Sequence, residues 1–301
     1  MCGIVGYFRK ASGEGPLGAV VLRMLSALGC RGPDSTGVAM YGGRRKSGAV
    51  VRIKLAEEEP PEPQIAAILR ALKPIAQVKA SGLNDGLFRL ELADGVSVAA
   101  VEQAVEQAVP GTEVFSVGRR LELVKRVGTA ADLDASYRVR GFKGTHFIGH
   151  TRLATESRVD ISHSQPFWAH GHLDLAAVHN GHITNYHRLR ALYEMNGHRF
   201  YTENDSEIIP VYLADQLAGG GTFEQALRRS TEQLDGTFSY LAATATDFGL
   251  AKDFFSAKPL LMAETEEAVV VATEELAIHA AFGRDAGAVE LSAREVRVWS
   301  R

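Results

Sequence analysis

Short apolar runs and helix-spaced apolar positions alternate along the first forty residues. Residues 2–8, CGIVGYF, form a continuous apolar run that favours a buried strand carrying the amino terminus into the core. Apolar residues recur at helical spacing over 17–28 and stop at Gly29, which predicts an amphipathic helix. Residues 37–42, GVAMYG, follow a breaker-rich stretch and predict a second strand. The chain is therefore expected to begin strand, helix, strand.

The middle of the chain predicts a small α/β unit that interrupts the rest. Residues 57–64, EEEPPEPQ, are acidic and proline-rich, which indicates an exposed linker or turn. The elements expected beyond it are a helix at 65–75, a strand at 87–92, a helix at 97–109, and strands at 113–117 and 121–125. No catalytic constellation stands out at about 55–135. This insertion suits a scaffold or subunit-docking role, with a regulatory ligand site as the alternative.

The remainder of the chain continues the alternation of strands and helices. Apolar runs predict strands at 147–151, 173–180, 238–245, 260–265 and 268–273, and helical patterns predict helices at 206–218 and 222–234. Such alternation indicates the α+β fold class without choosing among its layouts.

Composition and charge narrow the classes of partner. The 301 residues are 46% hydrophobic and 23% charged, with a formal net charge of -3. This balance gives no electrostatic support for nucleic acid or an anionic membrane, so a small molecule or a protein is the expected partner. No apolar run approaches the roughly 20 residues of a membrane span. Two cysteines imply no disulfide framework and favour a reducing compartment, the cytoplasm.

The first two residues, Met1 and Cys2, carry the most specific chemical signal. Removal of Met1 would leave Cys2 with a thiol and a free α-amine on one residue. Their unperturbed pKa values, about 8.5 and about 7.7 to 8.0, both lie near working pH. The amine can take the thiol proton, directly or through one water, and return it to a leaving group. By itself, a cysteine at this position is also common in proteins without such an activity.

Two polar motifs follow predicted strands in the second half. In GHTRLAT, Arg152 comes directly after a strand, where a guanidinium can hold a carboxylate through two parallel hydrogen bonds. An arginine here is equally typical of an exposed surface. In VHNGHI, the amide of Asn180 and the backbone NH of Gly181 can form an oxyanion hole, but Asn-Gly is also a common hairpin turn. The residues alone leave both alternatives open.

The TENDSE run precedes a predicted helix and also has two interpretations. Asp205 or Ser206 can cap that helix, or Asp205 can bind a substrate ammonium. The histidines are dense nearby but lack zinc-ligand spacing, so no metal site is expected. They are His163, His170, His172, His179, His182 and His187.

Seven segments together resemble the class II glutamine amidotransferases, which have an N-terminal cysteine nucleophile. They occur in family order: MCGIVGYF, RGPDSTG, GHTRLAT, HNGHITNY, TENDSE, DGTFSY and AKDFFSAKPL. The resemblance covers roughly residues 1–45 and 145–285. It implies one domain over 1–301, interrupted at about 55–135. The implied fold is the four-layer αββα sandwich of the N-terminal nucleophile hydrolases, with a small α/β insertion.

The resemblance also assigns roles at matching positions. Cys2 is the nucleophile and its amine the base, and Arg31 shapes the pocket near it. Arg152, assisted by Thr155, binds the glutamine α-carboxylate, and Asp205 holds the α-ammonium. Asn180 and Gly181 form the oxyanion hole. Glu156 stands where related sequences often have histidine, a departure at the carboxylate end of the pocket.

The implied activity is hydrolysis of L-glutamine to glutamate, with ammonia passed to a partner synthase. The motif order most resembles the free-standing glutaminase components of the glutamate synthase type, such as that of N-methylglutamate synthase. That resemblance places flavin and iron-sulfur cofactors on partner chains, because two cysteines cannot supply a four-thiolate cluster. The alternatives are a non-catalytic component that senses glutamine or serves as a scaffold, and a hydrolase of other amides.

Overall fold

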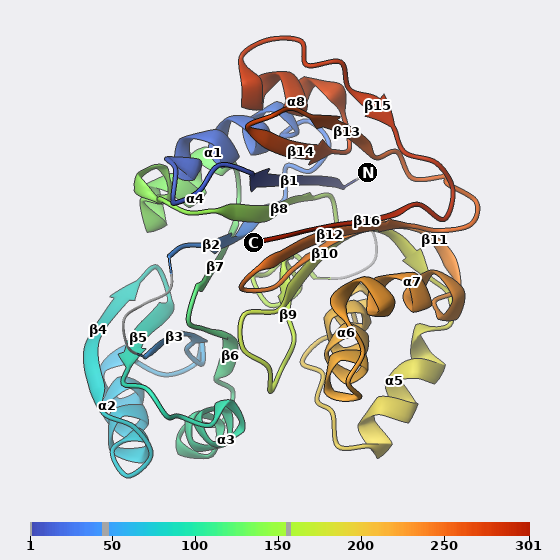
Figure 1. Cartoon of the computed structure of the whole chain (residues 1–301). Coiled ribbons are helices and arrows are strands. Elements are labelled where there is room, and N and C mark those ends of the chain that lie inside the picture. The colour runs from blue at the N-terminus through green and yellow to red at the C-terminus, as the bar shows by residue number, and fades with distance from the viewer. Residues whose placement is uncertain (1, 44–47, 155–157) are drawn as a thin grey trace.

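Seven antiparallel strands form the larger of two sheets that enclose the core (Figure 1). The computed structural model describes residues 2–43, 48–154 and 158–301. The predicted N-terminal strand is confirmed as β1, which lies between β14 and β8. In spatial order the strands are β15 (Val289–Glu290), β13 (Leu261–Glu264), β14 (Ala268–Ala272), β1 (Gly3–Arg9), β8 (His146–Arg152), β2 (Ser35–Tyr41) and β7 (Leu121–Val127).

A five-stranded antiparallel sheet packs against the inner face of the first. Its strands in spatial order are β16 (Val296–Ser300), β12 (Asp247–Lys252), β11 (Gly236–Ala243), β10 (Ala176–Ile183) and β9 (Phe167–Trp168). Apolar side chains from both sheets share one buried cluster, to which β1 contributes Ile4 and Phe8 and the facing sheet contributes Leu241 and Phe248. The sandwich is therefore held by burial of apolar surface between the sheets.

Helices cover the two outer faces. Because side chains alternate along a strand, Val5 of β1 points away from Ile4 and joins a second buried cluster under the helices. The helices on that side are α1 (Leu17–Ala27), α4 (Ala130–Tyr137) and α8 (Glu275–Phe282), with the 3₁₀ turn η1 (Val139–Gly141). The other sheet is covered by α5 (Tyr186–Met195), α6 (Ile208–Ala218) and α7 (Phe223–Gln233), after the 3₁₀ turn η2 (Asp205–Glu207). This arrangement confirms the predicted four-layer αββα sandwich.

A smaller α/β unit lies at one side of the sandwich (Figure 1, lower left). Its sheet has the order β4 (Val78–Asn84), β5 (Leu87–Leu92), β3 (Ala49–Lys54) and β6 (Glu113–Gly118), with helices α2 (Pro61–Leu72) and α3 (Val98–Ala108). The unit thus spans residues 49–118. β7 and α4 also fall within the predicted insertion, but β7 joins the seven-stranded sheet and α4 packs on α1.

The acidic, proline-rich stretch at 57–64 corrects one expectation. We expect a linker there, but α2 begins at Pro61, so half of the stretch forms the first turn of a helix. Proline is tolerated at that position because the first helical N–H groups have no partner within the helix. Gln64 is buried and secures this turn to the preceding strand segment, accepting a hydrogen bond from the backbone N–H of Ala56 at 2.8 Å.

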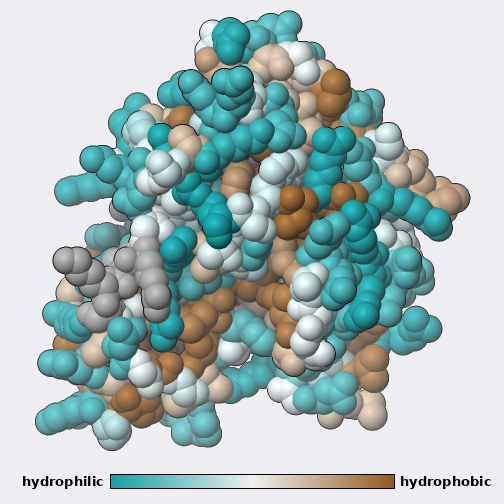
Figure 2. All heavy atoms as spheres, in the orientation of Figure 1, coloured by the Kyte–Doolittle hydropathy of each residue, from teal (hydrophilic) through white to brown (hydrophobic). Residues whose placement is uncertain are grey.

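Hydrophilic residues cover most of the face shown in Figure 2, and hydrophobic residues gather in the hollow between the α/β unit and the side of α5 to α7. Across the described residues, the helices are too short or too polar to cross a membrane.

Candidate active site

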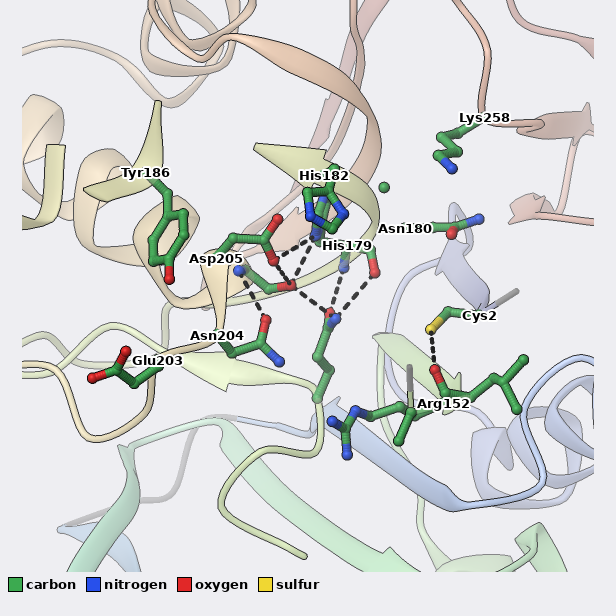
Figure 3. Close-up of a pocket in the computed structure, with 15 residues that line it drawn as sticks. Cys2, Arg152, His179, Asn180, His182, Tyr186, Glu203, Asn204, Asp205 and Lys258 are labelled. Carbon is green, nitrogen blue, oxygen red and sulfur yellow. Dashed lines mark hydrogen bonds and ion pairs between the residues drawn. The ribbon is translucent and has the colours of Figure 1, made fainter. Parts of the chain in front are cut away.

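A cavity of about 470 Å³ opens where the two sheets of the sandwich meet. Five of the residues singled out from the sequence line it: Cys2, Arg152, Asn180, Gly181 and Asp205. Figure 3 shows Cys2 and Asn180 on one side of the cavity, Asp205 on the opposite side, and Arg152 below them. Residues that are far apart in the chain therefore converge on one site.

The strand register explains why Cys2 and Arg152 meet. β1 runs antiparallel to β8, with Gly3 opposite Thr151, so the residue before β1 lies beside the end of β8. The Cys2 thiol donates a hydrogen bond to the carbonyl oxygen of Leu153, with Sγ 3.7 Å away. An antiparallel pair thus delivers a thiol and a guanidinium to the same edge of the sheet.

The RGPDS loop before β2 secures this edge. Asp34 accepts a hydrogen bond from the backbone N–H of Ala154 at 2.7 Å and donates its own N–H to the carbonyl of Arg152 at 3.0 Å. Gly32 lies against the backbone of Thr151, where a Cβ would come within 2.4 Å of the Thr151 carbonyl carbon. The loop therefore fixes the segment that follows Arg152.

Arg31 lies behind Cys2 and does not line the cavity. Its Nε donates to the carbonyl oxygen of Cys2 at 3.3 Å, and its Nη1 pairs with Glu274 at 2.5 Å. This position suits a residue that orients Cys2, rather than the direct substrate contact expected from the resemblance.

Arg152 is 4% exposed although it borders the cavity. Its Nη1 donates to the carbonyl oxygen of Arg158 at 2.9 Å, which holds the guanidinium in place. Burial lowers the pKa of Arg152 from its usual value, while nearby Cys2, Asp160 and Asp34 oppose that shift. The guanidinium is thus a fixed cation at the floor of the site.

Asn180 and Gly181 lie near the end of β10, in the second sheet. Among the residues that the structure describes, no acceptor lies within hydrogen-bond distance of the buried Asn180 Nδ2. Gly181 has φ of +146°, and a Cβ there would come within 2.1 Å of the Thr237 carbonyl oxygen on β11. Asn-Gly therefore forms part of a strand rather than a hairpin turn. A buried donor without a partner is available to a ligand in the cavity.

Asp205 begins the 3₁₀ turn η2 and does not act as a helix cap. The side chain of Asn204 caps η2 by accepting from Ser206 N at 3.0 Å, and α6 has no side-chain cap. The capping interpretation of Asp205 and Ser206 is therefore wrong. Asp205 instead accepts from the backbone N–H of Ile183 at 2.8 Å, which ties it to the end of β10.

A buried network behind Asp205 uses residues that the sequence did not point to. Gln165 donates to Ser206 Oγ at 3.0 Å and accepts from the backbone N–H of His179 at 2.6 Å. Ser206 Oγ donates to Asp205 at 3.3 Å, so His179 Nδ1, 2.8 Å away, is assigned as the donor to Ser206. Burial lowers the pKa of His179, which keeps this imidazole neutral.

Further lining residues carry charge or hydrogen-bonding groups, among them Lys258, Tyr186 and Glu203. Lys258 belongs to the AKDFFSAKPL segment, whose order in the sequence was the available signal. Thr155, expected to assist Arg152, and Glu156 lie outside the described residues.

One group of three possible metal ligands comes together in the described part of the chain, Glu275, His279 and Asp285, and none of the six clustered histidines belongs to it.

Comparisons with known proteins agree with this geometry. Residues 150–280 match the family model described as glutamine amidotransferase domain. The chain is 36% identical over 305 residues to a Methanothermobacter thermautotrophicus protein provisionally named glutamine amidotransferase, covering 99% of each. It is also 36% identical over 284 residues to the glutamine amidotransferase-like protein GlxB of Rhizobium meliloti, covering 92% of this chain and 91% of that one.

A solved structure shows the same fold. Glutamine phosphoribosylpyrophosphate amidotransferase from B. subtilis matches over 99% of this chain with a TM-score of 0.63 and 19% identity. This chain spans 47% of the length of that one. The chain belongs to the class II glutamine amidotransferases, which hydrolyse the side-chain amide of glutamine and are built on the N-terminal nucleophile fold.

Proposed function

We propose that Cys2, once Met1 is removed, is the nucleophile that hydrolyses L-glutamine in this cavity, and that the ammonia passes to a partner synthase. The observation that carries the proposal is the convergence of four groups on one cavity: a thiol, a guanidinium, a carboxylate and a buried amide donor without a partner among the described residues. Glutamine presents a carboxylate, an ammonium and a carboxamide, so each part of the substrate has a complementary group.

Binding orients the substrate in this scheme. Arg152 holds the α-carboxylate, with assistance from Thr155, and Asp205 holds the α-ammonium. Their opposite charges fix both the direction and the chirality of the amino acid, which brings the side-chain carboxamide to Cys2.

The chemistry then follows in two stages. The α-amine of Cys2 takes the thiol proton, sulfur bonds to the carboxamide carbon, and the oxyanion is stabilised by Asn180 Nδ2 and the backbone N–H of Gly181. The C–N bond breaks, the amine returns the proton to the leaving nitrogen, and ammonia departs from a γ-glutamyl thioester. Water, deprotonated by the same amine, attacks the thioester and releases glutamate and the thiol.

Lys258 adds a positive charge on the reacting side. Figure 3 shows its ammonium on the same side of the cavity as Asn180 and Cys2. Among the described residues, no carboxylate lies within ion-pair distance of it. We assign it the role of raising the local positive potential as negative charge develops on sulfur and oxygen.

The acceptor of the ammonia is proposed to be a synthase of the glutamate synthase or N-methylglutamate synthase type, with flavin and iron-sulfur cofactors on that partner. The support is the motif order in the sequence. The alternative is a non-catalytic component of the same complex that senses glutamine or serves as a scaffold.

Active-site labelling tests the nucleophile. Intact mass of the protein before and after treatment with a diazo-ketone analogue of glutamine should show one adduct on a Cys2 that lacks Met1, and glutamine should prevent it. Cys30, which is exposed, is the matched control: Cys30→Ala should keep the adduct and Cys2→Ala should lose it. Retained Met1 with glutamine binding but no adduct and no hydrolysis would favour the sensing alternative.

Isolation of the tagged full chain from its host tests the acceptor. We expect a co-purifying synthase with flavin absorbance and amination that depends on glutamine. Glutamine hydrolysis by the chain without any such partner would contradict the proposed acceptor and leave the glutaminase assignment standing.

A further inference from the structure

The small α/β unit reaches the segment that carries Asp205. Helix α3 presents Glu102 and Glu106 toward residues 199–207, which lead into η2. We propose that Glu102 and Glu106 are positioning residues for the ammonium-binding end of the cavity, so that the unit at 49–118 is a working part of the glutamine site. This inference rests on the proposed role of Asp205.

Glu102 is a buried carboxylate on α3, 5% exposed. One oxygen lies 2.9 Å from Nδ1 of His170, and the other accepts from the backbone N–H of Gly171 at 2.9 Å. A carboxylate is buried on a helix only where its partners compensate the loss of water. Both partners lie in the sandwich domain, so Glu102 joins the unit to that domain.

His170 continues this link toward the cavity. Its Nε2 lies 4.0 Å from Oε1 of Glu207, and its ring packs on Tyr201 with centroids 4.4 Å apart. The imidazole therefore lies between a carboxylate of the small unit and a carboxylate of η2, and a change in either alters its placement.

Glu207 organises the segment from inside. It is 1% exposed and accepts from the backbone N–H groups of Tyr201 and Thr202 at 2.8 and 3.0 Å, and from the Thr202 hydroxyl at 2.8 Å. Glu207 and Asp205 belong to the same single turn, η2. Because one turn has little freedom of its own, holding Glu207 also holds Asp205.

Glu106 makes a second attachment one turn further along α3. It accepts a hydrogen bond from the Tyr201 hydroxyl and pairs with Arg199. Tyr201 thus contacts α3 through its hydroxyl, His170 through its ring and Glu207 through its backbone. Two independent attachments, Glu102 through His170 and Glu106 through Tyr201, connect α3 to the turn that bears Asp205.

Such support matters most at the ammonium end of the site. A charged hydrogen bond depends on placement to within a fraction of an ångström, and a displacement of about 1 Å can cost up to a hundredfold in rate or binding. Asp205 has only Ile183 N and Ser206 Oγ as direct hydrogen-bond partners among the described residues. The small unit stabilises the turn that presents it.

The test compares two ligands that differ by one ammonium group. L-glutamate carries the α-ammonium and glutarate lacks it. Calorimetry on the full-length protein should show that Glu102→Gln and Glu106→Gln weaken L-glutamate binding about tenfold and leave glutarate binding unchanged. Glutaminase kinetics should show a raised KM with kcat within about twofold. Asp205→Asn serves as the reference for complete loss of the preference.

Controls separate positioning from folding. Glu62→Gln makes the same change at an exposed position of α2 in the same unit and should have no effect. Tyr201→Phe removes only the hydroxyl that donates to Glu106, and it provides a second route if a glutamate variant does not fold.

The outcomes are distinguishable. Variants that weaken glutamate and glutarate equally, or neither, overturn the inference. A wild-type protein that hydrolyses glutamine but does not prefer L-glutamate over glutarate overturns both the inference and the role of Asp205. A wild-type protein without glutaminase activity contradicts the proposed function, whatever the variants do to binding.

Discussion

The two ends of the cavity are built in different ways. At the reacting end, Cys2 immediately precedes β1 and Asn180 and Gly181 lie on β10, so backbone ladders of the two sheets place them. At the recognition end, Asp205 lies on a short turn that is held by side-chain hydrogen bonds from Ser206 and by networks that extend to α3. The chemistry rests on strands, whereas recognition rests on side chains.

This difference has a physical consequence. Ladder hydrogen bonds are numerous and mutually supporting, so a single side-chain change hardly moves a strand. A turn held by a few buried side chains moves when one of them is lost. Variants at the reacting end should therefore change kcat, and variants at the recognition end should change KM.

Loss of the nucleophile has the largest expected effect. Cys2→Ser should lower kcat on the order of 10⁴-fold or more, because no other group at the reacting end can form the thioester. Ammonia release with L-glutamine is the measurement. L-glutamate binding should persist in the same variant, and retention of wild-type turnover would be incompatible with the mechanism.

The oxyanion hole gives the next effect. Asn180→Ala should lower kcat about 10² to 10³-fold with little change in KM. Because Asn180 Nδ2 has no partner among the described residues, the variant should unfold at nearly the same temperature as the wild type. Asn196→Ala, at an exposed position of the chain, is the control. A kcat within twofold of wild type for Asn180→Ala would disprove the assignment.

At the recognition end, Arg152→Lys keeps the charge but loses the two parallel donors. We expect KM for glutamine to rise about tenfold while kcat changes by less than about threefold. The exposed Arg158, whose carbonyl oxygen accepts from Arg152, offers the control Arg158→Lys, which keeps that carbonyl. A fall in kcat with KM unchanged would reverse the comparison between the two ends.

The far end of β8 gives a smaller effect, on stability alone. Burial lowers the pKa of His146 from its usual value of about 6.5 to about 4. Between these values the unfolded chain binds a proton that the folded one does not. The free energy of unfolding should therefore fall as pH decreases from 6.5 toward 4, by about 1.4 kcal/mol per pH unit for this group.

Urea unfolding at pH 7, 6 and 5 measures this dependence. His146→Gln should flatten the slope by about one proton, because glutamine keeps hydrogen-bonding groups without titrating. The exposed His187→Gln should leave the slope unchanged. An unaltered slope in His146→Gln would show that the buried imidazole is not responsible.

The elements that were predicted well are those whose apolar spacing reflects their burial. The strand at 87–92 is β5, and the helical pattern from residue 17 is α1. In contrast β4, Val78–Asn84, is exposed along nearly its whole length and has no apolar alternation to reveal it. It pairs with β5 through its backbone, which a side-chain pattern does not report.

The candidate site divides along the same line. Its reactive groups could be identified from the order of amino acids, because a thiol next to an amino terminus, an Asn-Gly pair after an apolar run and an acidic turn have intrinsic chemistry. The folded chain was needed to show that Asn-Gly lies within a strand, that Arg31 lies behind Cys2, and that α3 supports the turn of Asp205. These outcomes depend on strand register and on contacts between residues up to about a hundred positions apart, such as Glu102 and Glu207 on either side of His170, and local sequence carries no record of such contacts.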